Sequence, residues 1–325
     1  MPDRPAARRP RREPPPPGLL VVDKPAGWTS HDVVGKARGL VGTRKVGHAG
    51  TLDPMATGVL VLGVERATKL LGHLALDTKT YRATVRLGVT TTTDDAEGEP
   101  TGGADASGLD EAAVAAGVAA LTGDLQQVPS SVSAVKVQGR RAYERVRAGE
   151  TVELDARPVH VARFAVDAVR RPPHTGAATP GVLDLDVEVD CSSGTYVRAL
   201  ARDLGAGLTG PAGAPVGGHL TALRRTRVGP FALEHARTVD ALVAESDGPA
   251  GRAALSLDLD AATALAFPRR DVDAAGADDL AHGRPLGPTG TSGTTAVFGP
   301  DGHVVGLVGD DRGRARPVLV LAPAT

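Results

Sequence analysis

Apolar and polar residues alternate in several stretches of the chain, and this period of two predicts strands. The clearest stretch is 182–190, where four apolar residues alternate with four acids, as in a strand with one buried face. A continuous apolar run that ends at Pro25 predicts a buried strand near the N-terminus. This N-terminal strand covers 18–25, and further strands are expected at 59–64, 80–87, 159–170 and 219–227.

Other stretches have the features of helices. Ser30 and Thr195 are expected to cap helices that run to about residues 40 and 208. The second of these helices would carry Arg198 and Arg202, four residues apart, on one face. Further helical segments are expected around 67–74, 109–121 and 140–147. Residues 236–257 are expected to form a helix followed by a linker.

The texture of the sequence changes at about residue 258, where glycines and turn residues become frequent. A hairpin is expected around Pro300-Asp301-Gly302, followed by a last strand at 317–321. We therefore expect a main domain at 18–257 and a small β-rich module at 258–325. The Arg- and Pro-rich segment 1–17 cannot bury a core and is expected to be a disordered basic tail.

The overall composition is that of a globular protein. The 325 residues are 41% hydrophobic and 23% charged, which is ample to bury a core. No apolar run is long enough to span a membrane, and the N-terminus lacks the apolar core of a secretory signal. The single cysteine, Cys191, excludes an intrachain disulfide and a zinc site built from several cysteines. These features predict a cytoplasmic protein.

Charge is distributed unevenly, although the formal net charge is only −1. Residues 94–111 hold seven acids and no Lys or Arg, whereas 127–148 and 198–228 each carry a net charge of +4. A near-neutral total can therefore hide a basic face that binds nucleic acid. From charge alone, ordinary solvated faces explain these clusters at least as well.

The most unusual chemistry is concentrated between Gly47 and Leu60, in the stretch GHAGTLDPMATGVL. Its glycines allow sharp turns or close approach, and Pro54 biases Asp53 toward an extended or turn backbone. On spacing alone, a structural aspartate in a tight turn is the favoured interpretation. The sequence has no P-loop, dinucleotide fingerprint or helical pair of metal-binding histidines. Any site here is therefore expected to use a carboxylate, without a metal or organic cofactor.

Separated blocks of the sequence resemble the TruB family of tRNA pseudouridine synthases. Spread over residues 18–230, the blocks are Asp23-Lys24-Pro25, Gly47-His48-Ala49-Gly50-Thr51-Leu52-Asp53-Pro54, Ala67-Thr68-Lys69, Lys79-Thr80-Tyr81, Ser133-Ala134, Gly194-Thr195-Tyr196-Val197-Arg198 and Leu223-Arg224-Arg225. An ordered match to so many blocks is more specific than any single motif. The resemblance implies an α+β fold with a central mixed, largely antiparallel sheet flanked by helices, followed by a small C-terminal PUA-like β-barrel.

The resemblance also implies an activity: isomerisation of uridine 55 in the T-arm of tRNA to pseudouridine, by a monomer without metal or cofactor. Asp53 matches the catalytic aspartate of the family, and Arg198 matches the arginine that pairs with it. Tyr81 matches the tyrosine that stacks on the flipped base and whose hydroxyl can serve in proton transfer. His48 matches a residue that helps to hold the opened RNA loop, and Tyr196 and Leu223 match residues that line the uracil pocket. Lys24 is expected to support either the site or a phosphate.

Two further assignments come from the resemblance. Asp95 lies in the acidic loop where the family has an aspartate that can share the arginine; a solvated loop acid is the alternative. The basic segment at about 127–156 corresponds to an insertion that closes over the RNA arm. Its Lys136, Arg140 and Arg141 are therefore expected to contact phosphates, with an affinity that depends on salt.

Some alternatives stay open at the level of sequence. Asp53 would attack either the ribose or the base ring, or the reaction would pass through a glycal intermediate. A guide-RNA-dependent relative would share the catalytic blocks, although the insertion and the short C-terminal module favour an enzyme that acts alone. The other alternative is an RNA-binding or tRNA-folding module without essential chemistry, and the intact set of Asp53, Tyr81 and Arg198 argues against it.

Overall fold

The structure of the 325-residue chain is a computed structural model. It describes residues 13–75, 78–130, 154–173 and 181–323, together with the backbone of 136–137 and 140–141. The expected tail therefore lies largely outside the described residues, and so does most of the expected insertion.

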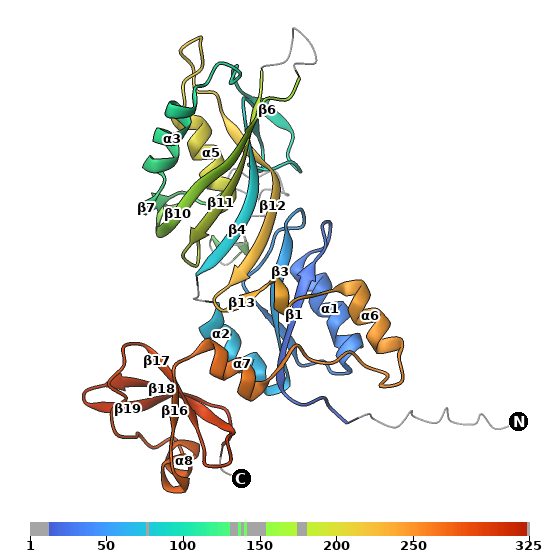
Figure 1. Ribbon diagram of the computed structural model, residues 1–325, viewed down its shortest axis with the longest axis vertical. Coiled ribbons are helices and arrows are strands. Elements are labelled where there is room, and N and C mark those ends of the chain that lie inside the picture. The colour runs from blue at the N-terminus through green and yellow to red at the C-terminus, as the bar shows by residue number, and fades with distance from the viewer. Residues whose placement is uncertain are drawn as a thin grey trace, which may run out of the picture.

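One sheet of eleven strands forms the body of the molecule (Figure 1). Its strands are β1 (Gly18–Lys24), β2 (Val46–Ala49), β3 (Thr57–Val64), β4 (Lys79–Leu87), β7 (Gly123–Gln127), β10 (Arg157–Arg170), β11 (Leu183–Cys191), β12 (Gly218–Val228), β13 (Phe231–Ala232), β14 (Arg237–Thr238) and β15 (Leu257–Asp258). The main path runs β14-β1-β3-β12-β4-β11-β10-β7. The pairs β1–β14 and β3–β12 are parallel and the others are antiparallel, so the expected mixed, largely antiparallel sheet is confirmed.

The alternating acids of β11 face basic partners on the neighbouring strands. Arg86 on β4 donates two hydrogen bonds to the Asp184 carboxylate, at 2.7 and 2.8 Å. Arg170 on β10 donates to Asp186 in the same two-pronged way, at 3.0 and 2.6 Å. Opposite charges on adjacent strands favour the observed register. The polar half of the β11 pattern is therefore paired within the sheet.

Helices flank this sheet, as expected. They are α1 (Ser30–Val41), the 3₁₀ helix η1 (Glu65–Leu70), α2 (Leu71–Leu74), α3 (Glu111–Ala120), α5 (Val197–Gly207), the 3₁₀ helix η2 (Leu233–His235) and α6 (Val239–Asp247). In Figure 1, α1 and α6 lie beside β1, whereas α3 and α5 lie beside β10 and β11. The sheet is thus covered near both of its ends.

Both expected helix caps are displaced by one residue. Thr29 caps α1, because its hydroxyl accepts from Asp32 N at 3.1 Å while the Asp32 carboxylate accepts from Thr29 N at 2.8 Å. This reciprocal pair satisfies two backbone donors of the first turn. Tyr196 stands at the cap position of α5 and provides no side-chain hydrogen bond, so the expected cap by Thr195 is wrong.

Two loop segments also differ from expectation. The basic segment at 140–147 does not begin as a helix: Arg140–Arg141 forms β9, which pairs with β8 (Lys136–Val137), and 142–147 lies outside the described residues. The acidic loop contains a short hairpin of β5 (Thr90–Thr91) and β6 (Pro100–Gly102). Backbone pairing therefore orders the loop that carries Asp95.

A second sheet, of four strands, forms the C-terminal unit (Figure 1). Its elements are α7 (Leu259–Ala266), β16 (Arg269–Asp271), α8 (Ala274–Ala281), β17 (Thr294–Phe298), β18 (Val304–Asp311) and β19 (Arg314–Val320). The hairpin of β17 and β18 confirms the expected one. Within the described residues, the strands follow one open path, β16-β17-β18-β19, so strand pairing does not close the expected barrel. The two helices were not expected from the sequence.

The two sheets share a buried apolar cluster. It includes Leu19 and Val61 from the large sheet, Ala262 from α7, and Phe298 and Leu307 from the small sheet. Shared burial of this kind ties the C-terminal unit to the large sheet. The boundary at residue 258 stays a prediction.

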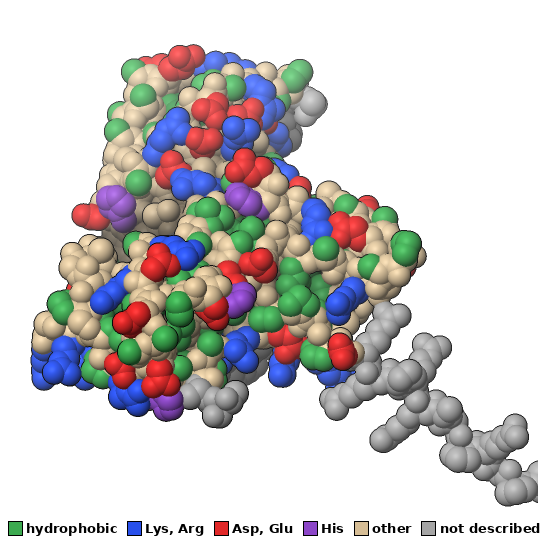
Figure 2. Space-filling view, turned by 60° about the horizontal axis from the view of Figure 1, so that its bottom comes forward, with side chains coloured by type: hydrophobic (Ala, Val, Ile, Leu, Met, Phe, Trp, Pro, Cys, Tyr) green, Lys and Arg blue, Asp and Glu red, His purple; other side chains and the backbone are tan. Residues whose placement is uncertain are grey.

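Charged side chains of both signs are interspersed over the face of the molecule shown in Figure 2. Mixed charge of this kind keeps a surface soluble without creating one strong field. None of the helices in the described part of the chain is both long and apolar enough to cross a membrane.

Candidate active site

Asp53 lies on the loop between β2 and β3, which is held on both sides of this residue. The Ser30 hydroxyl donates to Leu52 O at 3.1 Å and accepts from Leu52 N at 2.9 Å. After Asp53, the backbone oxygen of Pro54 accepts from Gly27 N at 2.8 Å. The Asp53 side chain is 36% exposed, so its carboxylate is accessible on a backbone that is fixed.

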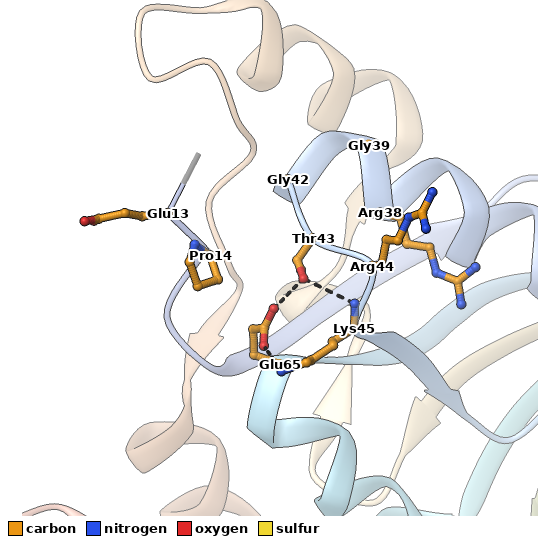
Figure 3. Close-up of a pocket in the computed structure, with 9 residues that line it drawn as sticks. All are labelled: Glu13, Pro14, Arg38, Gly39, Gly42, Thr43, Arg44, Lys45 and Glu65. Atoms are coloured by element: carbon orange, nitrogen blue, oxygen red, sulfur yellow. Dashed lines mark hydrogen bonds and ion pairs between the residues drawn. The ribbon is translucent and has the colours of Figure 1, made fainter. Parts of the chain in front are cut away.

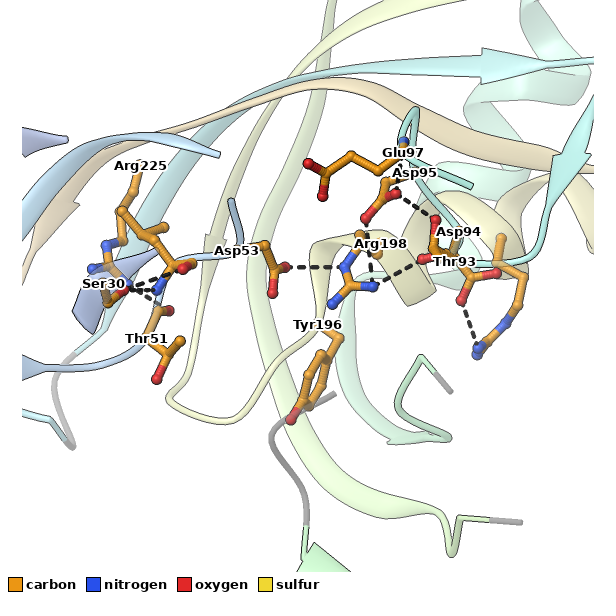
Figure 4. A network of polar contacts seen from close by, with 12 residues as sticks. Ser30, Thr51, Asp53, Thr93, Asp94, Asp95, Glu97, Tyr196, Arg198 and Arg225 are labelled. Carbon is orange, nitrogen blue, oxygen red and sulfur yellow. Dashed lines mark hydrogen bonds and ion pairs between the residues drawn. The ribbon is translucent and has the colours of Figure 1, made fainter. Parts of the chain in front are cut away.

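Arg198 on α5 connects the Asp53 loop with the acidic loop (Figure 4). Its Nε donates to Oδ2 of Asp53 at 3.0 Å, and its Nη1 donates to Thr93 O at 2.8 Å. The same Nη1 lies 3.5 Å from Oδ2 of Asp95. The side chains of Arg198 and Asp95 are only 3% and 4% exposed. One buried guanidinium therefore lies between an accessible carboxylate and a buried one.

Asp95 is held in place by its own loop. One carboxylate oxygen accepts from the Thr93 hydroxyl and from Glu97 N, the latter at 3.0 Å. Its burial excludes the alternative of a solvated loop acid. The sequence interpretation missed Glu97, whose pKa is raised by partial desolvation and by the nearby carboxylates of Asp95 and Asp53. Its position two residues after Asp95 was the only signal.

Lys24, at the end of β1, is fully buried beneath the Asp53 loop. Its Nζ donates to the backbone oxygens of Pro25, Trp28 and Pro54, at 3.0, 2.6 and 3.1 Å. These three bonds use all three donors of the ammonium group. Burial lowers the pKa of Lys24 to about 8, against the opposing attraction of the Asp53 carboxylate. Of the two roles expected for Lys24, the geometry fits support of the site and not contact with a phosphate.

Tyr81 and Arg225 are cross-strand neighbours on β4 and β12. Both are buried, and both line the same cavity. Burial raises the pKa of the Tyr81 hydroxyl, and the charge of Arg225 opposes that rise. The sequence interpretation named Arg225 only as part of a matched block, because nothing in the alternation of β12 indicates a buried arginine.

Asp53, Arg198, Tyr81 and Arg225 are among the residues that line a cavity of about 270 Å³. Five of the residues proposed from the sequence meet there: Asp53, Tyr81, Tyr196, Arg198 and Leu223. Gln127 supports this wall, since its side-chain amide accepts from Tyr196 N at 2.8 Å and donates to Tyr196 O at 3.1 Å. An apolar wall with a few convergent polar groups is typical of a small-molecule or nucleobase site.

The remaining residues proposed from the sequence are not among those that line this cavity. His48 lies on β2, where its ring meets that of His31 edge to face, with centroids 5.5 Å apart. Lys136, Arg140 and Arg141 belong to the β8–β9 hairpin, whose side chains lie outside the description. Their phosphate contacts stay a prediction.

A larger cavity, of about 1090 Å³, lies beside the start of β2 (Figure 3). It is lined by the basic residues Arg38, Arg44 and Lys45. Lys45 lies 3.4 Å from the Glu65 carboxylate, which also accepts from the Thr43 hydroxyl. The cation that pairs with Glu65 here, Lys45, is exposed, whereas the Arg198 guanidinium that orients Asp53 is buried. The Asp53 cavity is therefore the better candidate for chemistry. The described residues contain no group of three or more His, Cys, Asp or Glu side chains placed to hold a metal ion.

Comparisons with known proteins find relatives over nearly the whole chain. The profile described as "TruB family pseudouridylate synthase (N terminal domain)" matches residues 38–197, and "tRNA Pseudouridine synthase II, C terminal" matches residues 267–322. The proteins named tRNA pseudouridine synthase B from Rhodococcus jostii (strain RHA1) and Nocardia farcinica (strain IFM 10152) are 61% and 60% identical to this chain. The first match covers 95% of each chain and the second 96%.

The fold has a counterpart among solved structures. A chain of an H/ACA ribonucleoprotein bound to a substrate RNA containing 2'-deoxyuridine superposes with a TM-score of 0.66. The match covers 94% of this chain and 85% of that chain, at 21% identity, which is a likeness of fold. Because relatives of much higher identity cover almost its whole length, the chain belongs to the TruB family of pseudouridylate synthases.

Proposed function

We propose that the protein isomerises uridine 55 in the T-arm of tRNA to pseudouridine, with Asp53 as the attacking group. The observation that carries this proposal is the cavity in which the Asp53 carboxylate, the Arg198 guanidinium and the Tyr81 ring converge. The name of the 61% and 60% identical relatives, tRNA pseudouridine synthase B, supports tRNA as the substrate. The position within the T-arm comes from the resemblance of the sequence blocks.

The reaction exchanges one bond of the ribose for another. The bond between C1′ of the ribose and N1 of uracil breaks, the base rotates, and C1′ bonds to C5 instead. C5 then loses its proton and N1 gains one, so the product is an isomer and no second substrate is consumed. A carboxylate, a phenol and a guanidinium are sufficient groups for such a sequence of steps.

Asp53 has two possible points of attack. As a nucleophile it would bond either to C1′ of the ribose, releasing uracil, or to the uracil ring. In a third route the ribose loses a proton and passes through a glycal. Each route needs an accessible carboxylate of fixed direction, and the half-exposed Asp53 carboxylate on its doubly held loop meets that need.

Arg198 orients the Asp53 carboxylate. Its buried guanidinium holds Asp53 Oδ2 at 3.0 Å and balances the charge of the carboxylate. Asp95, 3.5 Å from the same guanidinium, shares this cation with Asp53. We infer that Asp95 releases or retains Arg198 as RNA binds.

Tyr81 and the cavity walls would receive the base. Uridine must leave the stack inside folded RNA, which costs a few kcal/mol. Stacking against the Tyr81 ring and contact with Leu223 and Tyr196 would offset part of that cost. Because burial raises its pKa, the Tyr81 hydroxyl is protonated at neutral pH and can donate or relay a proton.

The RNA arm would be held outside the cavity. His48 on β2 and the basic side chains of the 127–156 insertion, Lys136, Arg140 and Arg141, would contact the opened loop and its phosphates. Recognition would then depend on the shape of the arm and its splayed bases. The affinity would fall steeply with salt, as expected for phosphate contacts.

The decisive experiment maps pseudouridine in a T-arm stem-loop after incubation with purified protein and no other RNA. We expect modification at the base equivalent to position 55, and none when the target uridine is replaced by cytidine. Product that forms only with an added guide RNA would favour the guide-dependent alternative. Tight binding without any product would favour an RNA-folding module.

A further inference from the structure

We propose that Arg225 is a positioning residue of this site, one that holds the Asp53 loop in fixed relation to Tyr81 on the neighbouring strand. The proposal rests on the proposed function of the cavity. It assigns Arg225 no contact with the reacting atoms. It assigns the residue the task of setting the distance between the two groups that act on the uridine.

The first support is the set of hydrogen bonds made by the guanidinium. Nε donates to Val59 O at 2.8 Å, Nη2 to Gly50 O at 3.1 Å, and Nη1 to Thr51 O at 3.4 Å. Gly50 and Thr51 directly precede Leu52 and Asp53, whereas Val59 lies in β3 beyond the loop. One side chain, only 1% exposed, therefore fastens both ends of the loop that presents Asp53.

The second support is the proximity of Arg225 to Tyr81. The two residues are cross-strand partners, and both line the cavity. The pairing of β12 with β4 therefore places Tyr81 next to the guanidinium that holds the Asp53 loop. The charge of Arg225 also opposes the rise in the Tyr81 pKa that burial causes.

The third support is the placement of Arg225 in the sheet. On one side its Cα pairs with that of Tyr81 across β12–β4, and on the other with Gly58 across the parallel β12–β3 pair. Gly58 has a φ of +100°, and a Cβ there would lie 2.1 Å from Arg225 O. The glycine thus permits the close approach that puts the Arg225 side chain beneath the loop.

The charge of Arg225 gives a fourth argument. None of the ion pairs found among the described residues includes Arg225, although Arg224 beside it binds Asp23 at 2.7 Å. Burial of a cation that is bonded mainly to neutral carbonyl groups is costly. A neutral side chain could hold the loop without that cost. A cation in this place has the additional effect of lowering the pKa of the neighbouring Tyr81 phenol.

The test compares Arg225→Lys and Arg225→Met with Arg224→Lys, which changes the neighbouring arginine outside the cavity. Each folded variant is assayed for kcat and KM on the T-arm stem-loop, for RNA affinity, and for ultraviolet titration of the tyrosines with Tyr81→Phe as reference. For Arg225→Lys we expect kcat to fall by on the order of 100-fold, because a shift of about 1 Å can cost that much. RNA affinity should stay within about threefold, since the Arg225 side chain is only 1% exposed.

The titration separates positioning from mere structural support. Without the Arg225 charge, Tyr81 should titrate at higher pH in Arg225→Met than in the unmodified protein, whereas Arg224→Lys should leave both kcat and the titration unchanged. An unchanged kcat in folded Arg225→Lys, or a loss confined to RNA affinity, would overturn the proposal. If Arg225→Met does not fold, Arg225→Lys alone tests the proposal. A fall in kcat that is much larger than the change in KM supports it, and a change in KM without a fall in kcat overturns it. Absence of product with the unmodified protein would instead overturn the proposed function.

Discussion

Nε of Arg198 lies 3.0 Å from Oδ2 of Asp53, although the two residues are 145 positions apart in the chain. The arginine comes from α5 and the aspartate from the loop between β2 and β3. Thr93 O, in the acidic loop, fixes the other end of the guanidinium at 2.8 Å. Since the guanidinium is buried and the carboxylate is half exposed, whatever enters the cavity meets a carboxylate of fixed orientation.

Asp53→Asn removes the attacking carboxylate and keeps the shape of its side chain. We expect pseudouridine formation to fall by more than about 1,000-fold, because no amide can replace the nucleophile. The Kd for a T-arm stem-loop should change by less than about threefold, since the cavity walls are intact. Mapping of the modified base and fluorescence anisotropy measure the two effects. Normal turnover by this variant would refute the assignment of Asp53.

Tyr81→Phe keeps the ring that stacks on the base and removes the hydroxyl. We expect kcat to fall by about 100-fold through loss of proton transfer, with RNA affinity within about twofold. Tyr196→Phe removes another hydroxyl from the same cavity wall and should have a much smaller effect on kcat. Single-turnover rates and titration of labelled RNA check these expectations. Equal losses of rate and affinity in Tyr81→Phe would leave stacking as its only role.

The main sheet could be predicted from sequence because its strands carry a strong period of two or a continuous apolar run. β11 is the clearest example, with Leu183, Leu185 and Val187 buried on one face. The helices α7 and α8 were missed, since each is only eight residues long. Their capping residues were a usable signal: Asp258 and Asp273 each accept a hydrogen bond from the backbone three residues on, at 2.8 Å.

The site could be predicted only in part. Asp53, Tyr81 and Arg198 were found through matched blocks, and the structure brings them to one cavity. Arg225 was missed because its significance comes from burial, and Glu97 because its significance comes from the carboxylates that the fold brings near it. Local spacing reveals neither. Ser30 was read as a helix cap, whereas its hydroxyl binds the backbone of Leu52, 22 positions away. Tertiary contacts of this kind have no local signature.

Asp95→Asn should loosen the arrangement around Arg198. The amide keeps the shape of the side chain but loses the charge that faces the buried guanidinium, 3.5 Å away. We expect the free energy of unfolding to fall by about 2 kcal/mol, and kcat to fall by about tenfold. Asp94→Asn, whose carboxylate pairs with Arg202 instead, is the matched control and should cost less on both counts. Equal effects of the two changes in urea unfolding and turnover would contradict a special role for Asp95.

Lys24 makes stability depend on pH in a direction that can be measured. The folded chain releases the Lys24 proton near pH 8, whereas the unfolded chain keeps it up to the ordinary pKa of 10.5. Between these values the unfolded state binds more protons, so the free energy of unfolding rises with pH. Relative to Lys24→Met, which does not titrate, we expect a gain of about 2 kcal/mol between about pH 7.5 and about pH 9.5. A difference that stays constant in urea unfolding at the two pH values would show that Lys24 keeps its ordinary pKa.

Gly58 and Gly35 should respond in opposite ways to the same substitution. Gly58 has a φ of +100°, and its Cβ would meet Arg225 O at 2.1 Å, so Gly58→Ala should lower the free energy of unfolding by about 3 kcal/mol. Gly35 lies in the exposed part of α1 with nothing within 4 Å of its Cβ position, so Gly35→Ala should raise it by about 0.5–1 kcal/mol. Urea unfolding of both variants measures the contrast. Because Gly58→Ala also displaces the strand that carries Arg225, pseudouridine formation should fall in any fraction that still folds, whereas Gly35→Ala should turn over normally. Equal stability of the two variants would mean that β3 and β12 do not approach as closely as the structure places them.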